Sequence, residues 1–399
     1  MTEAPSCPAT FPIAREHPFD PPVEAGRWQR QGAFHRMTFA DGHLGWLVTS
    51  HSAARAVLAD NRFSNRVELT HPPVANPLAP RVDRRLPPGI FLRMDAPEHT
   101  RYRRLLTGQF TVRRMRLLEP RIEEIVSDCL DAMEKGPRPA DLVQDFGLPI
   151  PSLVICELLG VPYEDRVRFQ RDSAALLNLE SSAEQTNAAL ADLMGYLRDL
   201  VLRKRAEPAD DLLSGLVTSG ELNDEELTGV AFLLLVAGHE TTANMLSLGT
   251  FALLSNPDQL ARLREDPAVA ESAVEELLRY LTIVHMGPVR TALEDVEIDG
   301  WPIEAGETVA FSLPVVNRDP ERFDDPDALD ITRPPTGHLS FGHGIHQCLG
   351  QQLARAEMRI AYPALLRRFP DLRLAVAPEE VPMRSNMTIY GVHRLPVTW

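Results

Sequence analysis

The chain has 399 residues, with 41 basic and 56 acidic side chains and a formal net charge of −15. Phosphate backbones are bound by concentrated positive surfaces, so this charge balance excludes nucleic acid as a partner. Four scattered cysteines give no disulfide framework, and no apolar run reaches the ~20 residues that span a bilayer, so we expect a cytoplasmic protein without membrane attachment.

The predicted elements are mostly helices, with small patches of strand between them. A short strand is predicted at 45–49 and a short helix at 52–59, and the proline-rich residues 64–90 are predicted to form a long loop. Helical patterns follow at 97–108, 112–135, 151–159, 164–178, 183–206, 224–254, 257–264, 268–280 and 350–368. Strand-like segments lie at 289–292, 296–298 and 309–313. No linker or repeat divides the chain, so we expect one mainly α domain with small β-sheets over residues 1–399.

Positive charge is concentrated in one short stretch of this acidic chain. Six arginines lie within sixteen residues, at Arg101, Arg103, Arg104, Arg113, Arg114 and Arg116. Such a cluster can be an ordinary solvated helix face. It can equally be a docking surface for an acidic electron donor, because complementary charge steers association.

The longest predicted helix, 224–254, is roughly 45 Å long and opens with the capping pair Asn223 and Glu226. Its middle reads AGHETT over residues 237–242. One glycine and two threonines are poor choices inside a helix, costing about 0.5 to 1 kcal/mol each, and a local rule broken within an apolar run indicates a functional site. The alternative is a helix kink in which Thr241 bonds to a backbone carbonyl.

Residues 341–350 read FGHGIHQCLG, which places Cys348 in a glycine-rich turn just before a predicted helix. Backbone N–H groups at a helix start stabilise negative charge and lower a thiol pKa, so the turn favours a thiolate presented to a metal. A zinc site made by His343, His346 and Cys348 is a second interpretation, although no nearby fourth ligand supports it. The other cysteines are expected to be small buried hydrophobic residues: Cys7, Cys129 and Cys156.

At three places the chain resembles the cytochrome P450 family. It matches the family patterns F-G-x-G-x-H-x-C-x-G at 341–350, A-G-x-[DE]-T-[TS] at 237–242 and E-x-x-R at 276–279. The resemblance implies the cytochrome P450 fold and a haem b cofactor, iron protoporphyrin IX, whose iron takes Cys348 as its ligand. It further implies that the following residues hold the haem: His99, Arg103, Arg290, Phe341, Gly342, His346 and Cys348.

The resemblance also implies roles for the long helix and for the E-x-x-R motif. Glu240 and Thr241 would deliver protons during oxygen activation, in a helix that is distorted to leave room for dioxygen. Glu276 and Arg279 would pair on one helix face and, together with Arg333, fix the loop that carries the cysteine.

The function that the resemblance implies is insertion of one atom of O2 into a hydrophobic small molecule, by hydroxylation or epoxidation, in secondary or xenobiotic metabolism. Electrons would come from a separate ferredoxin and ferredoxin reductase, and the enzyme itself is expected to be a monomer. The expected substrate contacts are Leu234, Ala237, Gly238, Val284, Met286 and Ile389. Two alternatives stay open: a P450-fold enzyme that catalyses oxidative coupling or desaturation, and a non-catalytic relative that binds haem or recruits a partner.

Overall fold

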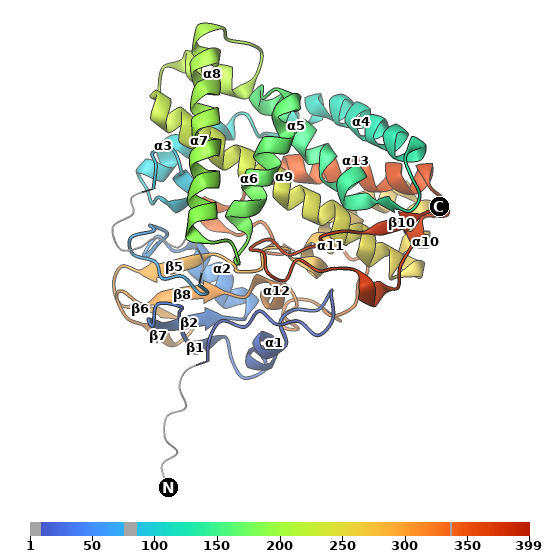
Figure 1. Ribbon diagram of the computed structural model, residues 1–399. Helices are drawn as coiled ribbons and strands as arrows, with labels where there is room; N and C mark the ends of the chain where they lie inside the picture. Colours follow the sequence, from blue (N-terminus) through green and yellow to red (C-terminus); the bar gives the residue numbers. More distant parts are fainter. Residues whose placement is uncertain (1–8, 76–85, 336) are drawn as a thin grey trace.

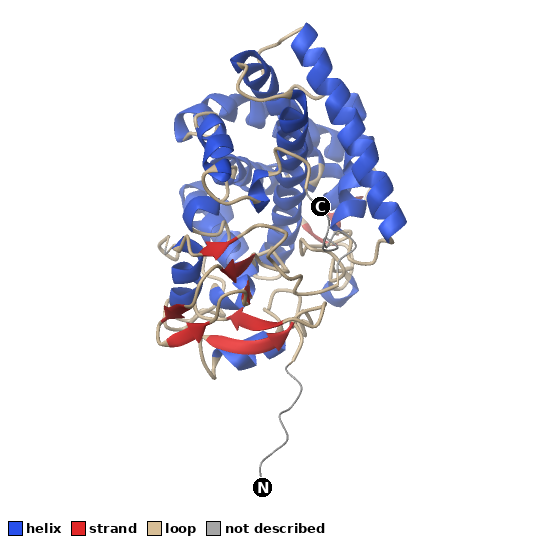
Figure 2. Cartoon of the chain, turned by 90° about the vertical axis from the view of Figure 1, so that its left-hand side faces the viewer, coloured by secondary structure: helices blue, strands red, loops and turns tan. Residues whose placement is uncertain are grey.

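The structure, a computed structural model, describes residues 9–75, 86–335 and 337–399 (Figure 1). Helices make up most of the molecule, and the main sheet lies at one end, near the N-terminal elements (Figures 1 and 2). The α-helices are α1 Val23–Gln29, α2 His51–Ala59, α3 Glu98–Thr107, α4 Val112–Lys135, α5 Pro149–Leu159, α6 Arg166–Leu177, α7 Ala183–Ala206, α8 Leu212–Ser219, α9 Asp224–Leu254, α10 Pro257–Glu265, α11 Ala270–Leu281, α12 Leu313–Val316 and α13 Gln351–Arg368. None of these helices is both long and apolar enough to cross a membrane.

The main sheet joins the two ends of the sequence. The strands are β1 Phe34–Thr38, β2 Leu44–Val48, β3 Phe63–Ser64, β4 Ala140–Asp141, β5 Val289–Ala292, β6 Val296–Ile298, β7 Trp301–Ile303, β8 Thr308–Phe311, β9 Arg373–Leu374 and β10 Pro396–Thr398. In the described residues, five of them form the main sheet in the order β1-β2-β8-β5-β3. β2 runs parallel to β8, with Trp46 opposite Val309 and Val48 opposite Phe311. This pairing places the N-terminal hairpin against the region that precedes Cys348.

Every predicted helix is present, and three of them, 112–135, 183–206 and 224–254, have the predicted bounds. The prediction was wrong at 309–313, where β8 ends at Phe311 and α12 begins at Leu313, because Pro314 has no N–H to continue a sheet and suits the first turn of a helix. The prediction also missed α1 and α8, the five-residue strand β1 and the shorter strands β3, β4, β7, β9 and β10.

The proline-rich segment behaves as predicted where the structure describes it. Residues 65–75 and 86–90 contain no helix or strand, whereas Ser64 still belongs to β3. The middle of the predicted loop, 76–85, lies outside the described residues.

α9 is the central helix of the molecule and packs against α5, α7 and α13 (Figure 1). Its start has the predicted capping box: the Asn223 side chain accepts from the Glu226 N–H over 3.0 Å, and Glu226 accepts from the Asn223 N–H over 2.9 Å. Further along, Gly249 lies against Tyr362 of α13, whose hydroxyl donates to the Met245 carbonyl over 2.5 Å. A Cβ on Gly249 would stand 2.1 Å from that hydroxyl, so the glycine sets the distance between the two helices.

We predict that Gly249→Ala lowers the free energy of unfolding by about 1 to 3 kcal/mol, because the added methyl group overpacks the contact with Tyr362. Gly195→Ala is the matched control, since Gly195 lies inside α7 and nothing stands within 4 Å of an added Cβ. The control should gain about 0.5 to 1 kcal/mol from helix propensity alone. Urea unfolding measures both changes, and the same sign for the two variants would contradict the prediction.

Candidate functional site

The predicted motifs around Cys348 and in the middle of α9 share one cavity. The cavity has a volume of 450 Å³ and lies between α9, the 3-10 turn Phe91–Arg93 and the cysteine loop, defined here as residues 341–350. Its wall is mostly apolar, with Leu234 from α9 and Leu353 from α13 among the lining residues. A cavity of this size and character is suited to a small apolar ligand or cofactor.

The cysteine loop is held in place by two left-handed glycines and by α2. Gly342 and Gly344 have φ angles of +68° and +73°. A Cβ on Gly344 would stand 2.2 Å from the Leu58 carbonyl oxygen of α2, so only glycine allows this approach. The Cys348 N–H donates to the Phe341 carbonyl over 2.8 Å. The loop therefore presents the Cys348 side chain to the cavity.

Opposing influences act on the thiol of Cys348. Its accessible surface faces the cavity while the surrounding protein excludes most water, and this burial raises the pKa of the thiol. The backbone N–H groups of Gly350 and Gln351, where α13 begins, act in the opposite direction, as do the guanidinium groups of Arg103 and Arg355. A metal cation bonded to the sulfur would add the positive charge that the thiolate needs.

Arginine and histidine side chains form much of the polar part of the cavity wall. Arg103, Arg290 and His346 line the cavity, and neither arginine has an ion-pair partner among the described residues. Burial lowers the pKa of Arg290 to about 10 and the pKa of His346 to about 3, so the imidazole is neutral at pH 7. His99 does not line the cavity but lies behind His346, with ring centroids 4.2 Å apart. Glu357 is the one carboxyl group among the lining residues, and burial raises its pKa, which favours the neutral form. The wall thus offers positive charge and N–H donors, and neither Arg103 nor Arg290 is paired with that carboxyl group.

Sequence reasoning missed one further arginine of this wall. Arg93 ends the turn Phe91–Arg93, lines the same cavity and donates to Asn65 over 3.3 Å and to Thr70 over 2.6 Å. No motif marks it, because it lies just after the proline-rich segment in a stretch without periodicity.

The part of α9 that faces the cavity carries small side chains. Ala237 and Gly238 line the cavity together with Thr241. α9 is helical throughout, so the space at its surface comes from missing side-chain atoms, and the expected distortion does not break the helix. The Thr241 hydroxyl donates to the Ala237 carbonyl over 2.8 Å, as in the alternative interpretation of this motif. Thr241 nevertheless borders the cavity, next to the small residues.

Glu240 does not line the cavity. Its side chain is buried, at 3% exposure, and its Oε2 accepts from Arg384 over 3.0 Å and from Asn244 over 3.4 Å. The ion pair connects α9 to the C-terminal segment. A buried carboxylate is thereby held one residue away from the cavity-facing Thr241. His239, beside it, is fully buried, with Nδ1 2.7 Å from the Leu235 carbonyl oxygen.

The structure brings most of the expected substrate contacts to the cavity: Leu234, Ala237, Gly238 and Val284. Met286 and Ile389 do not line it. A bend at 285–286 breaks the alternation that would place Met286 beside Val284, and Met286 packs instead in a buried cluster with Phe11 and Val289. Ile389 pairs with Val284 through a backbone bridge, and its side chain packs against the main core.

The structure brings the three residues of the predicted structural network together, and Glu276 is bonded to both Arg279 and Arg333. Glu276 and Arg279 are 2% and 1% exposed, and two N–H groups of Arg279 donate to the Glu276 carboxylate over 2.7 and 2.8 Å. Its other N–H groups donate to three backbone carbonyls within residues 317–328. Arg333 Nε donates to Glu276 over 3.3 Å. The guanidinium of Arg279 is therefore fully bonded, and the chain that leads to the cysteine loop converges on it.

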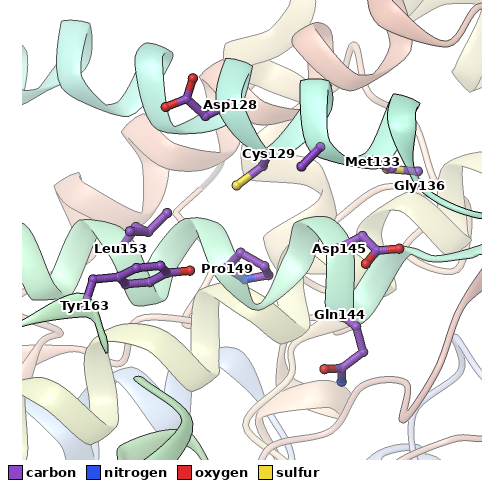
Figure 3. Close-up of a pocket in the computed structure, with 10 residues that line it drawn as sticks. Asp128, Cys129, Met133, Gly136, Gln144, Asp145, Pro149, Leu153 and Tyr163 are labelled. Atoms are coloured by element: carbon purple, nitrogen blue, oxygen red, sulfur yellow. The ribbon is translucent and has the colours of Figure 1, made fainter. Parts of the chain in front are cut away.

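A second pocket, of 340 Å³, lies between α4 and α5 (Figure 3). Cys129 projects from α4 into it, facing Tyr163, and burial raises the pKa of this thiol to about 11, so it is neutral. The two pockets share no lining residue. Within the described residues no group of three or more His, Cys, Asp or Glu side chains could hold a metal ion, so the zinc site considered for the cysteine loop is not formed.

Comparison with known proteins identifies the family of this fold and site. The cytochrome P450 family model matches residues 197–396. Cytochrome P450 105C1 from a Streptomyces species is 54% identical over 100% of both chains, and pentalenic acid synthase from Streptomyces avermitilis is 47% identical over 99% of this chain and 98% of that protein. The crystal structure of CYP105P1 in complex with filipin I has a TM-score of 0.93 and 46% identity, covering 98% of this chain and 99% of the other. The chain belongs to the cytochrome P450 family and is a P450 monooxygenase.

We predict that Glu276→Ala destabilises the protein by about 3 to 5 kcal/mol, because it leaves the guanidinium of Arg279 buried without its counter-charge. Glu271→Ala is the control, since Glu271 is an exposed acidic residue in the first turn of the same helix. Urea unfolding of the purified variants tests the difference. An unfolding midpoint for Glu276→Ala equal to that of Glu271→Ala would refute it.

Proposed function

We propose that the chain binds haem b, iron protoporphyrin IX, in the cavity with Cys348 as the iron ligand, and inserts one oxygen atom from O2 into a hydrophobic small molecule. The main support is that a single thiol shares the cavity with the guanidinium groups of Arg103 and Arg290, neither of which has an ion-pair partner among the described residues. Haem is a flat, largely apolar group with two carboxylates, so an apolar wall, one sulfur and arginines fit it. A thiolate-bound haem supplies the electron density that favours O–O bond cleavage.

The chain's own residues would bind and orient the cofactor. We assign the cofactor contacts to residues that line the cavity: Arg103, Arg290, Phe341, Gly342 and His346. The arginines suit carboxylates because their planar N–H groups bond two oxygens at once. His99 would act indirectly, through its ring contact with His346. Glu276, Arg279 and Arg333 would keep the cysteine loop in position without touching the cofactor.

Proton delivery is the second task assigned to the chain. The hydroxyl of Thr241 donates to the Ala237 carbonyl in this structure, and rotation of its hydrogen lets it donate into the cavity instead. The neighbouring Glu240 carboxylate is held by Arg384. Release from this ion pair frees the carboxylate to take up a proton and pass it toward Thr241.

The substrate is proposed to be a hydrophobic secondary metabolite or xenobiotic, oxidised by hydroxylation or epoxidation. The apolar side chains of Leu234 and Val284 and the space beside Gly238 support this class. The similar proteins point the same way, since one is named a pentalenic acid synthase and another was crystallised with filipin I.

Electrons are proposed to come from a ferredoxin and its reductase, docking on exposed arginines near the start of α4. Arg113, Arg114 and Arg116 are exposed there. Arg101 instead pairs with Glu226, and Arg103 lines the cavity. The exposed basic surface therefore contains fewer arginines than the six that the sequence analysis considered. We retain the proposal of a monomeric, cytoplasmic, single-domain enzyme, in keeping with three free cysteines among the described residues.

Reduced protein exposed to carbon monoxide should show the Soret shift of thiolate-ligated haem. We predict that Cys348→Ala loses this signature, because the side chain no longer supplies a sulfur ligand. Cys129→Ala removes a thiol from the separate pocket and should keep it. A wild-type protein that purifies without haem, or a Cys348→Ala variant with an unchanged spectrum, would overturn the proposed function.

Thr241→Ala should keep the carbon monoxide spectrum but form less product per NAD(P)H consumed, by roughly tenfold, because one hydrogen-bond donor at the cavity is lost. Thr241→Ser retains a hydroxyl and should stay near the wild type. The measurement is hydrogen peroxide released per NAD(P)H, with a bound metabolite and a ferredoxin system. Equal coupling in the alanine and serine variants would remove Thr241 from proton delivery.

A further inference from the structure

Two guanidinium groups of the cavity wall share one neutral acceptor. Arg290 Nη1 donates to Asn65 Oδ1 over 3.0 Å, and Arg93 Nη1 donates to the same oxygen over 3.3 Å. The other terminal nitrogen of Arg93 donates to Thr70 over 2.6 Å. Like charges held this close repel each other, so an anion bound nearby would stabilise the pair.

The electrostatics of the two arginines agree with this geometry. Burial lowers the pKa of both Arg93 and Arg290 to about 10, and the charge of Arg93 adds to the lowering at Arg290. Both pKa values stay well above 7, so both arginines are charged at neutral pH.

Nearby carboxylates do not neutralise these arginines. Asp95 favours the charged forms of both Arg93 and Arg290, but its Oδ2 accepts from Ser64 Oγ over 2.5 Å and its Oδ1 from the Asn65 N–H over 2.8 Å. Glu68, which also acts on Arg93, is exposed and lies 3.8 Å from Arg66.

The cavity wall carries three arginines, Arg93, Arg103 and Arg290. Asp95 does not line the cavity. Glu357 is the one carboxyl group among the lining residues, and its burial raises its pKa and so favours the neutral form. The two propionates of haem b would therefore find positive charge at this wall, part of it from Arg93.

We propose that Arg93 is a third cationic partner of the haem propionates, bonding a propionate together with Arg290 across Asn65. This inference rests on the proposed haem function. A carboxylate on the substrate would have the same chemistry, and the experiment below separates the two sources.

The test compares Arg93→Gln, Arg93→Lys and the control Arg66→Gln, an exposed arginine of the same segment. In the substrate-free holoenzyme, Arg93→Gln should transfer haem to an acceptor globin about tenfold to 100-fold faster, because a bond between charged groups is lost. It should also lower the haem reduction potential, since removing a nearby cation favours the more positive ferric form. Arg93→Lys should keep the potential but lose haem faster, and Arg66→Gln should match the wild type in both.

Three results would overturn the proposal. One is haem transfer and potential in Arg93→Gln equal to those of Arg66→Gln. Another is unchanged haem transfer combined with weaker binding of laurate, but not of dodecanol, which would assign the carboxylate to the substrate. Should Arg93→Gln fail to fold, Arg93→Lys decides, and haem transfer at the control rate would refute the proposal. A wild-type protein without haem would instead refute the proposed function itself.

Discussion

A guanidinium group that is buried away from water needs an acceptor for each of its N–H groups. The buried side chain of Arg279 has this need, and backbone carbonyls from the C-terminal third of the chain meet it. Its side chain is 1% exposed, and residues 317–328 fold back so that their carbonyls meet it. Asn317 connects this segment to the residues just before the cysteine loop, because its side chain accepts from the Leu339 N–H over 2.7 Å and donates to Ser340 over 2.9 Å. The cysteine loop begins at the next residue. Its position therefore follows from a charge buried in α11.

α9 separates two electrostatic environments. The cavity side has small residues, Thr241 and a wall of arginines, while the Glu240 carboxylate is bonded to Arg384 and Asn244 outside the cavity. Within the proposed function, this arrangement keeps the proton-carrying carboxylate away from the cations that hold the cofactor. The anionic cofactor and the proton carrier consequently do not compete for the same partners, although Glu240 and Thr241 are adjacent in sequence.

The helical framework could be predicted because its signals are local: Asn223 and Glu226 mark the start of α9 within four residues of sequence. The shortest strands could not, since β4 and β9 have two residues each and exist because β10 pairs with both. The site divides in the same way. Glu276 and Arg279 could be predicted because they lie one helical turn apart. Arg93 could not, because its hydrogen bond to Asn65 joins two residues that no sequence pattern connects. No sequence pattern indicates the bend that turns Met286 away from the cavity either.

The N-terminal elements support a loop that is synthesised almost 300 residues later than they are. Gly344 rests on the Leu58 carbonyl, β2 pairs with β8, and the His51 N–H donates to Asp319 over 2.6 Å. While the ribosome is still translating the middle of the chain, β2 has an unpaired edge and α2 has no loop to support, and an open edge invites pairing with other chains. Rapid recombinant expression multiplies such half-finished chains, so slower synthesis at low temperature favours recovery of folded protein over inclusion bodies.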